Sequence, residues 1–124
     1  MKNDLTQNAA LIEIKTPSSK LLGPEYRNGI FNISSELIGS VMQVLNYKHT
    51  LQENYFSVSK GQRDLFHSFD PQCVVIIGHT KELDKEEKRK SFELYRRQMQ
   101  GTLIVTYDEL YEKTRKLIRV METP

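Results

Sequence analysis

One short run limits the fold of this chain more than any other segment. Residues 73–77 read Cys-Val-Val-Ile-Ile, and Gly78 ends the run. β-Branched residues favour strands, and an uninterrupted apolar strand is typical of a parallel sheet with helices on both faces. We therefore expect a central strand at residues 73–77, buried on both faces, with Cys73 as a small core side chain rather than a disulfide or metal ligand.

Strand and helix patterns alternate along the rest of the chain. Further strands are expected at residues 11–15 and 103–105, and apolar spacing predicts helices over 34–53, 81–100 and 108–121. Strands that alternate with helices favour right-handed crossovers. The predicted fold class is therefore α/β, with a mostly parallel sheet flanked by helices.

Two stretches give weaker signals. Residues 18–32 contain Gly23, Pro24 and Gly29 and are expected to form an irregular connection, with at most a short strand near 30–33. A loop of that length in a compact domain is more often functional than decorative. A short helix is expected near residues 64–69.

The predicted helix over 34–53 has two different faces. Ser34 can cap its start. Its buried face is expected to contain Leu37, Ile38, Val41, Met42 and Leu45. Its opposite face is expected to contain Glu36, Ser40, Gln43 and Tyr47.

Composition sets broad limits on function. The 124 residues suit one domain, and 38% hydrophobic and 27% charged residues are typical of a folded protein. The apolar runs are too short for a bilayer, and the scattered histidines do not have zinc-ligand spacing. A net charge of +2 is too small to indicate a nucleic-acid binder, so any surface for phosphates must be a local patch.

Glu13-Ile14-Lys15 is the most informative short segment for chemistry. Residues two apart on a strand point to the same side, so a carboxylate lies beside an ammonium group. Phosphodiester hydrolysis needs a magnesium-activated water and stabilisation of the charge that develops at phosphorus. Glu13 could bind magnesium and Lys15 could orient the water, but taken alone the pair is more often a surface ion pair.

Gln43 and Tyr47 lie one helical turn apart, on the polar face of the predicted helix over 34–53. On helical geometry alone, a solvated face with a single tyrosine is the more common explanation. The pair gains weight because it follows the Glu13-Lys15 strand in the sequence.

A resemblance joins these segments. Residues 10–17, Ala-Leu-Ile-Glu-Ile-Lys-Thr-Pro, resemble the Glu-x-Lys strand of restriction-endonuclease-like nucleases with a Pro-Asp...(Asp/Glu)-x-Lys motif. Gln43-xxx-Tyr47 is similar to the helix motif of their RecB-like branch. These segments, together with residues 18–22, 26–27, 34–37, 75–78 and 106–110, resemble the carboxy-terminal domain of the Shedu family over roughly residues 9–121.

This resemblance implies a cytoplasmic bacterial anti-phage protein that nicks or cuts DNA with Mg²⁺ or another divalent cation. It implies that Glu13 binds the metal, that Lys15 is catalytic, and that Gln43 and Tyr47 support the active site. On residue chemistry alone, the Ile14 carbonyl could add a further metal ligand. The family has a further metal-binding aspartate upstream of this strand. Because Asp4 is a poor counterpart in its turn-like setting, we expect residues 1–124 to be one nuclease-like domain that is truncated at its amino terminus.

Lys20, Tyr26 and Arg27 are the expected DNA contacts, because they follow the Glu13-Lys15 strand and loops at strand ends often form sites. Loop packing explains them equally well. The basic residues over 81–100 are mixed with acidic ones, which favours a solvated helix laced with ion pairs.

Two functions from different classes remain open. The first is a metal-dependent DNA endonuclease of anti-phage defence. The second is a catalytically inactive α/β module that binds DNA or a partner protein within a defence complex. A homo-oligomer is compatible with both.

Overall fold

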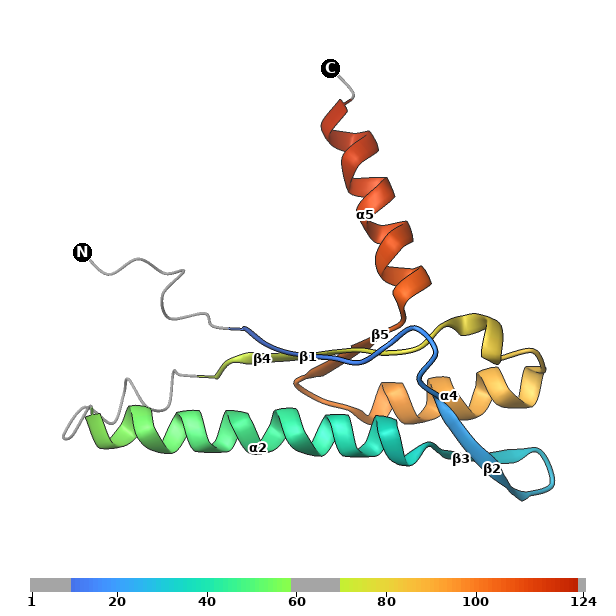
Figure 1. Ribbon diagram of the computed structural model, residues 1–124, viewed down its shortest axis with the longest axis horizontal. Helices are drawn as coiled ribbons and strands as arrows, with labels where there is room; N and C mark the ends of the chain where they lie inside the picture. Colours follow the sequence, from blue (N-terminus) through green and yellow to red (C-terminus); the bar gives the residue numbers. More distant parts are fainter. Residues whose placement is uncertain (1–9, 59–69, 123–124) are drawn as a thin grey trace.

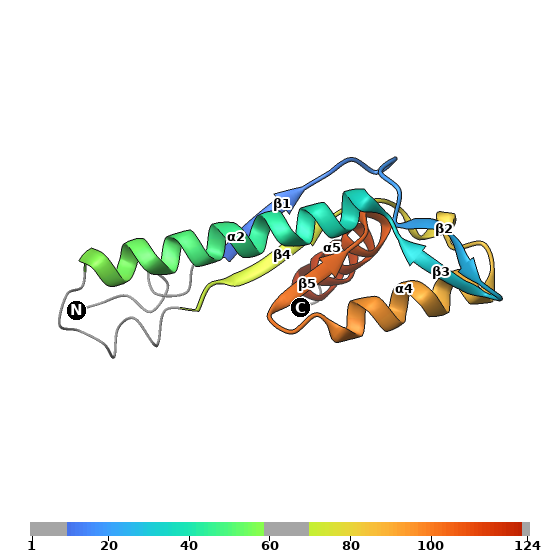
Figure 2. The same ribbon diagram turned by 90° about the horizontal axis from the view of Figure 1, so that it is seen from below.

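The computed structural model describes residues 10–58 and 70–122, and its architecture is drawn in Figures 1 and 2. The elements run in chain order as β1 (Ala10–Ile14), β2 (Leu22–Arg27), β3 (Ile30–Ile33), α2 (Ser35–Val58), β4 (Gln72–Ile76), η1 (Thr80–Glu82), α4 (Glu86–Gln98), β5 (Thr102–Val105) and α5 (Tyr107–Glu122). The helix expected near residues 64–69 and the side chain of Asp4 lie outside the described residues.

A parallel sheet forms the centre of the fold. β4 lies between β1 and β5, with Leu11 opposite Cys73 on one side and Val75 opposite Ile104 on the other. The predicted central position of the strand at 73–77 is therefore confirmed, as is the mixed α/β, restriction-endonuclease-like class. The strand is central because its β-branched side chains are the ones that two flanking strands and a helix layer can bury.

The core lies between the sheet and a layer formed by α2 and α4. Figures 1 and 2 show both helices on the same side of the sheet. Buried side chains from all three layers meet there, and they include Leu37, Val41, Val44, Cys73, Val75, Ile77, Phe92 and Ile104. Each fully buried aliphatic or aromatic side chain contributes roughly 1.5–3 kcal/mol relative to exposure, so this cluster is the main stabilising element.

Only one face of the sheet is buried, which corrects the expectation that β4 is covered on both. Ile12 and Ile14 on β1 and Leu103 on β5 are between 49% and 63% exposed on the other face. Helix α5 projects from that side of the sheet in Figure 1, and none of its described residues is buried. The sequence pattern could not settle this, because an apolar strand shows that its side chains can be buried but does not show whether helices cover one face or both.

An antiparallel hairpin of β2 and β3 replaces the expected irregular connection. The expected short strand at 30–33 is present, but β2 was missed. Its register shifts twice between Leu22 and Arg27, and Gly23 and Pro24 interrupt the side-chain alternation that predicts a strand. The hairpin packs against α4, where the Phe31 amide donates to Ser91 Oγ at 3.0 Å.

Helix α2 begins where it was expected and is longer than expected. The Leu37 amide donates to Ser34 Oγ at 3.0 Å, so Ser34 caps the helix. The assignment of faces needs three corrections. Ser40 is buried, with its hydroxyl donating to the Glu36 carbonyl at 2.7 Å, whereas Ile38 and Met42 are 44% and 59% exposed. The core contacts a narrower stripe of the helix than the apolar pattern indicates.

Thr106 and Glu109 fix the start of α5. The Thr106 amide donates to Glu109 Oε1 at 3.1 Å, as in a capping box. Arg96 of α4 donates to the Glu109 carboxylate and to the Ile104 carbonyl at 3.2 Å. Burial acts to lower the pKa of Arg96, but its bonds to Glu109 and Glu93 outweigh it and raise the pKa. This charged cluster joins α4, β5 and α5.

No helix in the described ranges has the length and apolar character needed to cross a lipid bilayer.

Candidate functional site

Glu13 and Lys15 share the covered face of β1. Glu13 is in register with Val75, a fully buried core residue, so its side chain lies on the face that α2 covers. Lys15 Nζ lies 3.8 Å from Glu13 Oε1, and the two side chains are 38% and 16% exposed. A half-buried carboxylate beside an ammonium group is therefore present at the carboxyl end of β1.

The Ile14 carbonyl points away from the sheet. The Lys15 amide donates to the Ile76 carbonyl at 2.8 Å, so it points toward β4. The Ile14 carbonyl belongs to the same trans peptide and points in the opposite direction. Since β1 is the outer strand of the sheet as far as the chain is described, this oxygen faces an open edge beside Glu13.

Gln43 and Tyr47 form a second pair on α2. Gln43 Nε2 donates to Tyr47 Oη at 2.9 Å, and Tyr47 is half exposed. Ile38, on the other flank of α2, borders a surface pocket together with Tyr95 of α4. Figure 2 shows β1 and α4 on opposite sides of α2, and α2 packs against β1.

The two pairs lie on neighbouring elements without touching directly. The hydrogen bonds and ion pairs within residues 10–58 and 70–122 join Glu13 to Lys15 and Gln43 to Tyr47, but none joins one pair to the other.

The oxygen donors suit a hard divalent cation in part. The Glu13 carboxylate and the outward Ile14 carbonyl are ligands that Mg²⁺ accepts, and Mg²⁺ often takes only one or two carboxylates and completes its shell with water and phosphate. Among the described residues, no group of three or more acidic, histidine or cysteine side chains is placed to bind a metal. Glu13 is the carboxylate that the predicted motif contributes to this site.

The expected DNA contacts do not form one cluster. Lys20 is exposed and lies in the turn directly after β1. Tyr26 and Arg27 are at the far end of β2, where the Arg27 guanidinium lies 5.2 Å from the centre of the exposed Tyr26 ring. Tyr26 lies six residues after Lys20, which is about 20 Å along an extended chain.

Asp108 ties the loop after β4 to α5 beside this site. The Thr80 amide donates to Asp108 Oδ1 at 3.0 Å, and the Thr80 hydroxyl donates to the other carboxylate oxygen. Burial acts to raise the pKa of Asp108, but hydrogen bonds from Thr80 and Thr106 outweigh it and lower the pKa to about 2. His79 Nδ1 lies 3.6 Å from Asp108 Oδ1 and accepts the Lys81 amide at 3.0 Å, so His79 is held as a turn residue.

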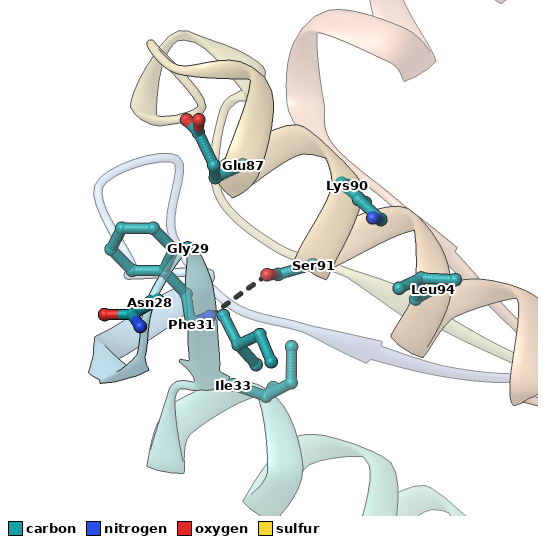
Figure 3. Close-up of a pocket in the computed structure, with 9 residues that line it drawn as sticks. Asn28, Gly29, Phe31, Ile33, Glu87, Lys90, Ser91 and Leu94 are labelled. Carbon is teal, nitrogen blue, oxygen red and sulfur yellow. Dashed lines mark hydrogen bonds between the residues drawn. The ribbon is translucent and has the colours of Figure 1, made fainter.

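An apolar pocket of about 530 Å³ lies elsewhere, between β3 and α4. Figure 3 shows Phe31 and Ile33 of the hairpin facing Ser91 and Leu94 of α4, with Glu87 and Lys90 at the border. Neither Glu13 nor Lys15 lines it. The pocket follows from the packing of the hairpin on α4 and does not contain the paired polar groups of the candidate site.

A comparison with known families shows which family the chain belongs to. The family described as Shedu protein SduA, C-terminal, matches residues 1–111. The chain belongs to this Shedu family. It is also similar to the Shedu protein SduA of Bacillus cereus (strain B4264), with 41% identity over 126 residues that cover 97% of this chain and 33% of the relative. The Shedu chain thus spans about a third of the length of the curated relative that it matches.

Sequence reasoning missed three residues that hold the site of this Shedu chain in place. Tyr107 donates its hydroxyl to the Lys15 carbonyl, the Gly78 amide donates to the Thr16 carbonyl at 3.0 Å, and Glu82 accepts the Leu21 amide at 2.8 Å. Each bond joins residues about 60 or more positions apart. The available signals were a glycine at a strand end and a tyrosine at a helix start, and neither indicates its partner.

Proposed function

We propose that this chain is a nuclease-like domain that hydrolyses DNA phosphodiester bonds with a divalent cation, as part of bacterial defence against phages. Membership of the Shedu family supports the defence role, because the resemblance to that family implies an anti-phage protein. Phage DNA is replicated in the cytoplasm of the host, so the proposal places the domain there, with DNA as its partner.

The observation that carries the proposal is the Glu13-Lys15 pair beside an outward backbone carbonyl at an open strand edge. The carboxylate, the carbonyl and the ammonium group belong to three consecutive residues of one chain segment, and the Gln43-Tyr47 pair lies on α2, which packs against β1. An ordinary surface ion pair would not need an outward backbone carbonyl beside it. The Glu13 side chain is also mostly buried, which is costly for a charge without a binding role.

Each residue has a definite role in this proposal. Glu13 and the Ile14 carbonyl would hold the cation, which supplies charge neutralisation and an activated water when it is bound. The Lys15 ammonium group orients the attacking water and balances the charge that develops on the phosphoryl oxygens. Gln43 and Tyr47 offer an amide and a phenol as hydrogen-bond donors to the phosphate or its water.

Plasmid nicking tests the proposal. Supercoiled plasmid is incubated with Mg²⁺ and the protein at its full natural length, either unchanged or as Lys15→Ala. We expect the substitution to lower the nicking rate by roughly 100-fold or more, the loss typical of removing a charge-stabilising group. Lys85→Ala, which changes an exposed lysine just before α4, is the matched control. Equal nicking by the unchanged protein and Lys15→Ala would remove Lys15 from the reaction.

A metal titration separates the role of Glu13 from that of Lys15. Mn²⁺, followed by its electron paramagnetic resonance signal, is a probe that needs no DNA. Glu13→Gln removes the charged ligand while it keeps the side-chain size, so we expect at least a 10-fold weaker affinity for Mn²⁺. Unchanged affinity would show that the cation binds elsewhere.

A second candidate function, assembly with another copy of the chain, is favoured by α5. Its apolar side chains repeat at helical spacing and are exposed, notably Leu110, Leu117, Ile118 and Met121. A helix that presents an apolar stripe to water is unusual for a monomer. The first half of α5 is mainly acidic and the second half mainly basic, so two antiparallel copies would place opposite charges together.

Sedimentation of the unchanged protein, Leu117→Gln and Lys116→Gln tests this candidate. Leu117 lies on the apolar stripe and Lys116 on the polar side, so only Leu117→Gln should shift the protein toward the monomer. A monomeric unchanged protein would contradict self-association. Protection of α5 from hydrogen exchange in that monomer would then indicate cover by the rest of its own chain.

A further inference from the structure

The turn that follows β1 gathers three hydroxyl groups at the end of the candidate catalytic strand. Residues 16–20 are called the hydroxyl turn here. Thr16 Oγ1 lies 3.1 Å from Ser18 Oγ and 2.9 Å from Ser19 Oγ. The Thr16 amide also donates to Ser19 Oγ at 3.2 Å, so Ser19 closes the turn from within. Thr16 and Ser18 are exposed, and Ser19 is half buried.

The backbone at the start of the hydroxyl turn is held by two distant elements. The Gly78 amide, just after β4, donates to the Thr16 carbonyl at 3.0 Å. The Tyr107 hydroxyl, at the start of α5, donates to the carbonyl of Lys15. These bonds fix the Lys15-Thr16 peptide and the Thr16-Pro17 peptide that follows it.

The end of the turn is held equally firmly. Both oxygens of Glu82 accept backbone amides, from Leu21 at 2.8 Å and from Leu22 at 3.0 Å. The Ser34 hydroxyl donates to the Lys20 carbonyl at 2.6 Å. The backbone is thus bonded to β4, η1, α5 and the start of α2, while the Thr16, Ser18 and Lys20 side chains remain outside. Such a loop loses little conformational entropy when it binds a ligand.

The exposed side chains of the hydroxyl turn are hydrogen-bond donors, and the turn contains no acidic residue. Within the described ranges, the Thr16 and Ser18 hydroxyls bond to other hydroxyls, and no carboxylate accepts a hydrogen bond from either. Serine, threonine and lysine side chains are common donors to the phosphate oxygens of DNA. Two hydroxyls and an ammonium group on a fixed loop match an anionic oxygen group better than an apolar or cationic ligand.

We propose that Thr16, Ser18 and Lys20 bind a DNA backbone phosphate next to the phosphate that is cleaved. The inference rests on the proposed nuclease function and deepens it. Thr16 directly follows Lys15, and successive phosphates of one DNA strand are about 3.4 Å apart along the helix axis, so the turn reaches a neighbouring phosphate. This contact sets where Lys15 meets the strand without taking part in the reaction.

Double-mutant analysis with modified DNA tests the phosphate site. Binding of a short duplex is measured by fluorescence anisotropy, with Ca²⁺ in place of Mg²⁺. The unchanged protein is compared with the Thr16→Val/Ser18→Ala variant. Each is tested on the native duplex and on duplexes in which one phosphate, at successive positions, is replaced by a neutral methylphosphonate. We expect the double variant to bind the native duplex roughly 10-fold more weakly or worse, the loss typical of at least one hydrogen bond to a charged group. At one position, the methylphosphonate should weaken duplex binding by the unchanged protein by a similar factor. The same methylphosphonate should weaken binding by the double variant much less.

Controls separate a lost contact from a lost fold. Ser19 is left unchanged because it closes the turn, and Thr114→Val removes an exposed hydroxyl whose bond is to the Leu110 carbonyl of its own helix. Thr114→Val should bind as the unchanged protein does. An equal methylphosphonate penalty for the double variant and the unchanged protein, with equal urea midpoints, would overturn the phosphate site. Absence of any duplex binding by the unchanged protein would overturn it as well.

The test keeps the two proposals apart. A protein that nicks plasmid through Lys15 but shows no coupling at Thr16 and Ser18 retains the nuclease function and loses the phosphate site. A protein that shows the coupling but does not nick with Mg²⁺ retains the phosphate site and loses the nuclease function. Inorganic phosphate at matched ionic strength should compete poorly, because a single free phosphate lacks the contacts that the duplex makes elsewhere.

Discussion

Gly78 holds the loop after β4 against the hydroxyl turn at a distance that only glycine permits. Its φ is +70°, and a Cβ atom there would lie 2.8 Å from Leu21 Cδ2 and 2.9 Å from the Ser19 carbonyl oxygen. The first contact could be relieved by a side-chain movement, but the second is with backbone. Both the conformation and the space therefore require glycine, and the hydrogen bond to Thr16 depends on it.

Gly78→Ala should destabilise the protein far more than Gly101→Ala. Both glycines have positive φ, but a Cβ at Gly101 meets nothing closer than Lys48 Nζ at 3.9 Å. The left-handed conformation alone costs about 1–2 kcal/mol for alanine, and overpacking adds about 1–3 kcal/mol. Urea unfolding followed by circular dichroism should show losses of roughly 2–4 kcal/mol for Gly78→Ala and about 1 kcal/mol for Gly101→Ala. Equal losses would mean that the crowding is relieved by movement of the turn.

At the scale of single elements, Asp108 joins η1 to the first turn of α5 by accepting two bonds from Thr80. The pKa of Asp108 is about 2 in the fold, below the 3.8 of the unfolded chain. A lowered folded pKa stabilises the fold above the unfolded pKa, and that contribution is lost as the pH falls from about 4 toward 2. The junction of α5 with the site should therefore weaken in acid.

Asp108→Asn tests the charge at this junction. We expect the variant to lose roughly 1–2 kcal/mol of unfolding free energy at pH 7, after allowance for solvent screening, and the difference should shrink below pH 4. Urea midpoints measured between pH 7 and pH 3 give the comparison. Asp84→Asn, at an exposed carboxylate 3.2 Å from Lys88, should behave as the unchanged protein. If Asp108→Asn is still less stable than the unchanged protein at the lowest pH, the lost stability would come from altered packing rather than from the missing charge.

How well the sequence predicts an element depends on the range of the contacts that define it. β1, β4, β5 and the capped start of α2 follow from local patterns, and so do the Glu13-Lys15 and Gln43-Tyr47 pairs, because strand and helix periods place them. β2 was missed because its bulged register is set by pairing with β3, not by its own alternation. Ser40 was placed wrongly because the width of a buried stripe depends on what packs against it.

The supports of the site could not be predicted for the same reason. Glu82, Gly78 and Tyr107 act through backbone atoms of residues 15–22, and backbone donors and acceptors leave no pattern in the sequence. A glutamate in a charged stretch would be assigned to the solvent, yet Glu82 accepts two amides from a loop 60 residues away. Sequence reasoning therefore finds reactive groups more readily than the residues that position them.

For the whole molecule, several cations are already paired with carboxylates. The net charge is +2, and three cations of α4 lie in ion pairs, with Lys88 at 3.2 Å from Asp84, Arg89 at 3.1 Å from Glu86, and Arg96 bonded to Glu93 and Glu109. The expected ion pairs of this helix are therefore present. The cations that we expect to contact phosphates are Lys15, Lys20 and, at the hairpin tip, Arg27.

Duplex binding by this chain should therefore depend only modestly on salt. Each neutralised phosphate contributes about −0.9 to the slope of log K against log salt, so three contacts predict a slope of roughly −2 to −3. Lys20→Gln should reduce the magnitude of the slope by about 0.9. Thr16→Val/Ser18→Ala should weaken binding but leave the slope unchanged, because hydroxyls release no counterions. Anisotropy titrations from 50 to 200 mM KCl measure both, with Lys113→Gln on α5 as the control. A slope steeper than about −5 would show that the paired cations of α4 open to meet DNA, and the basic helix rather than the β1 edge would then be the main binding surface.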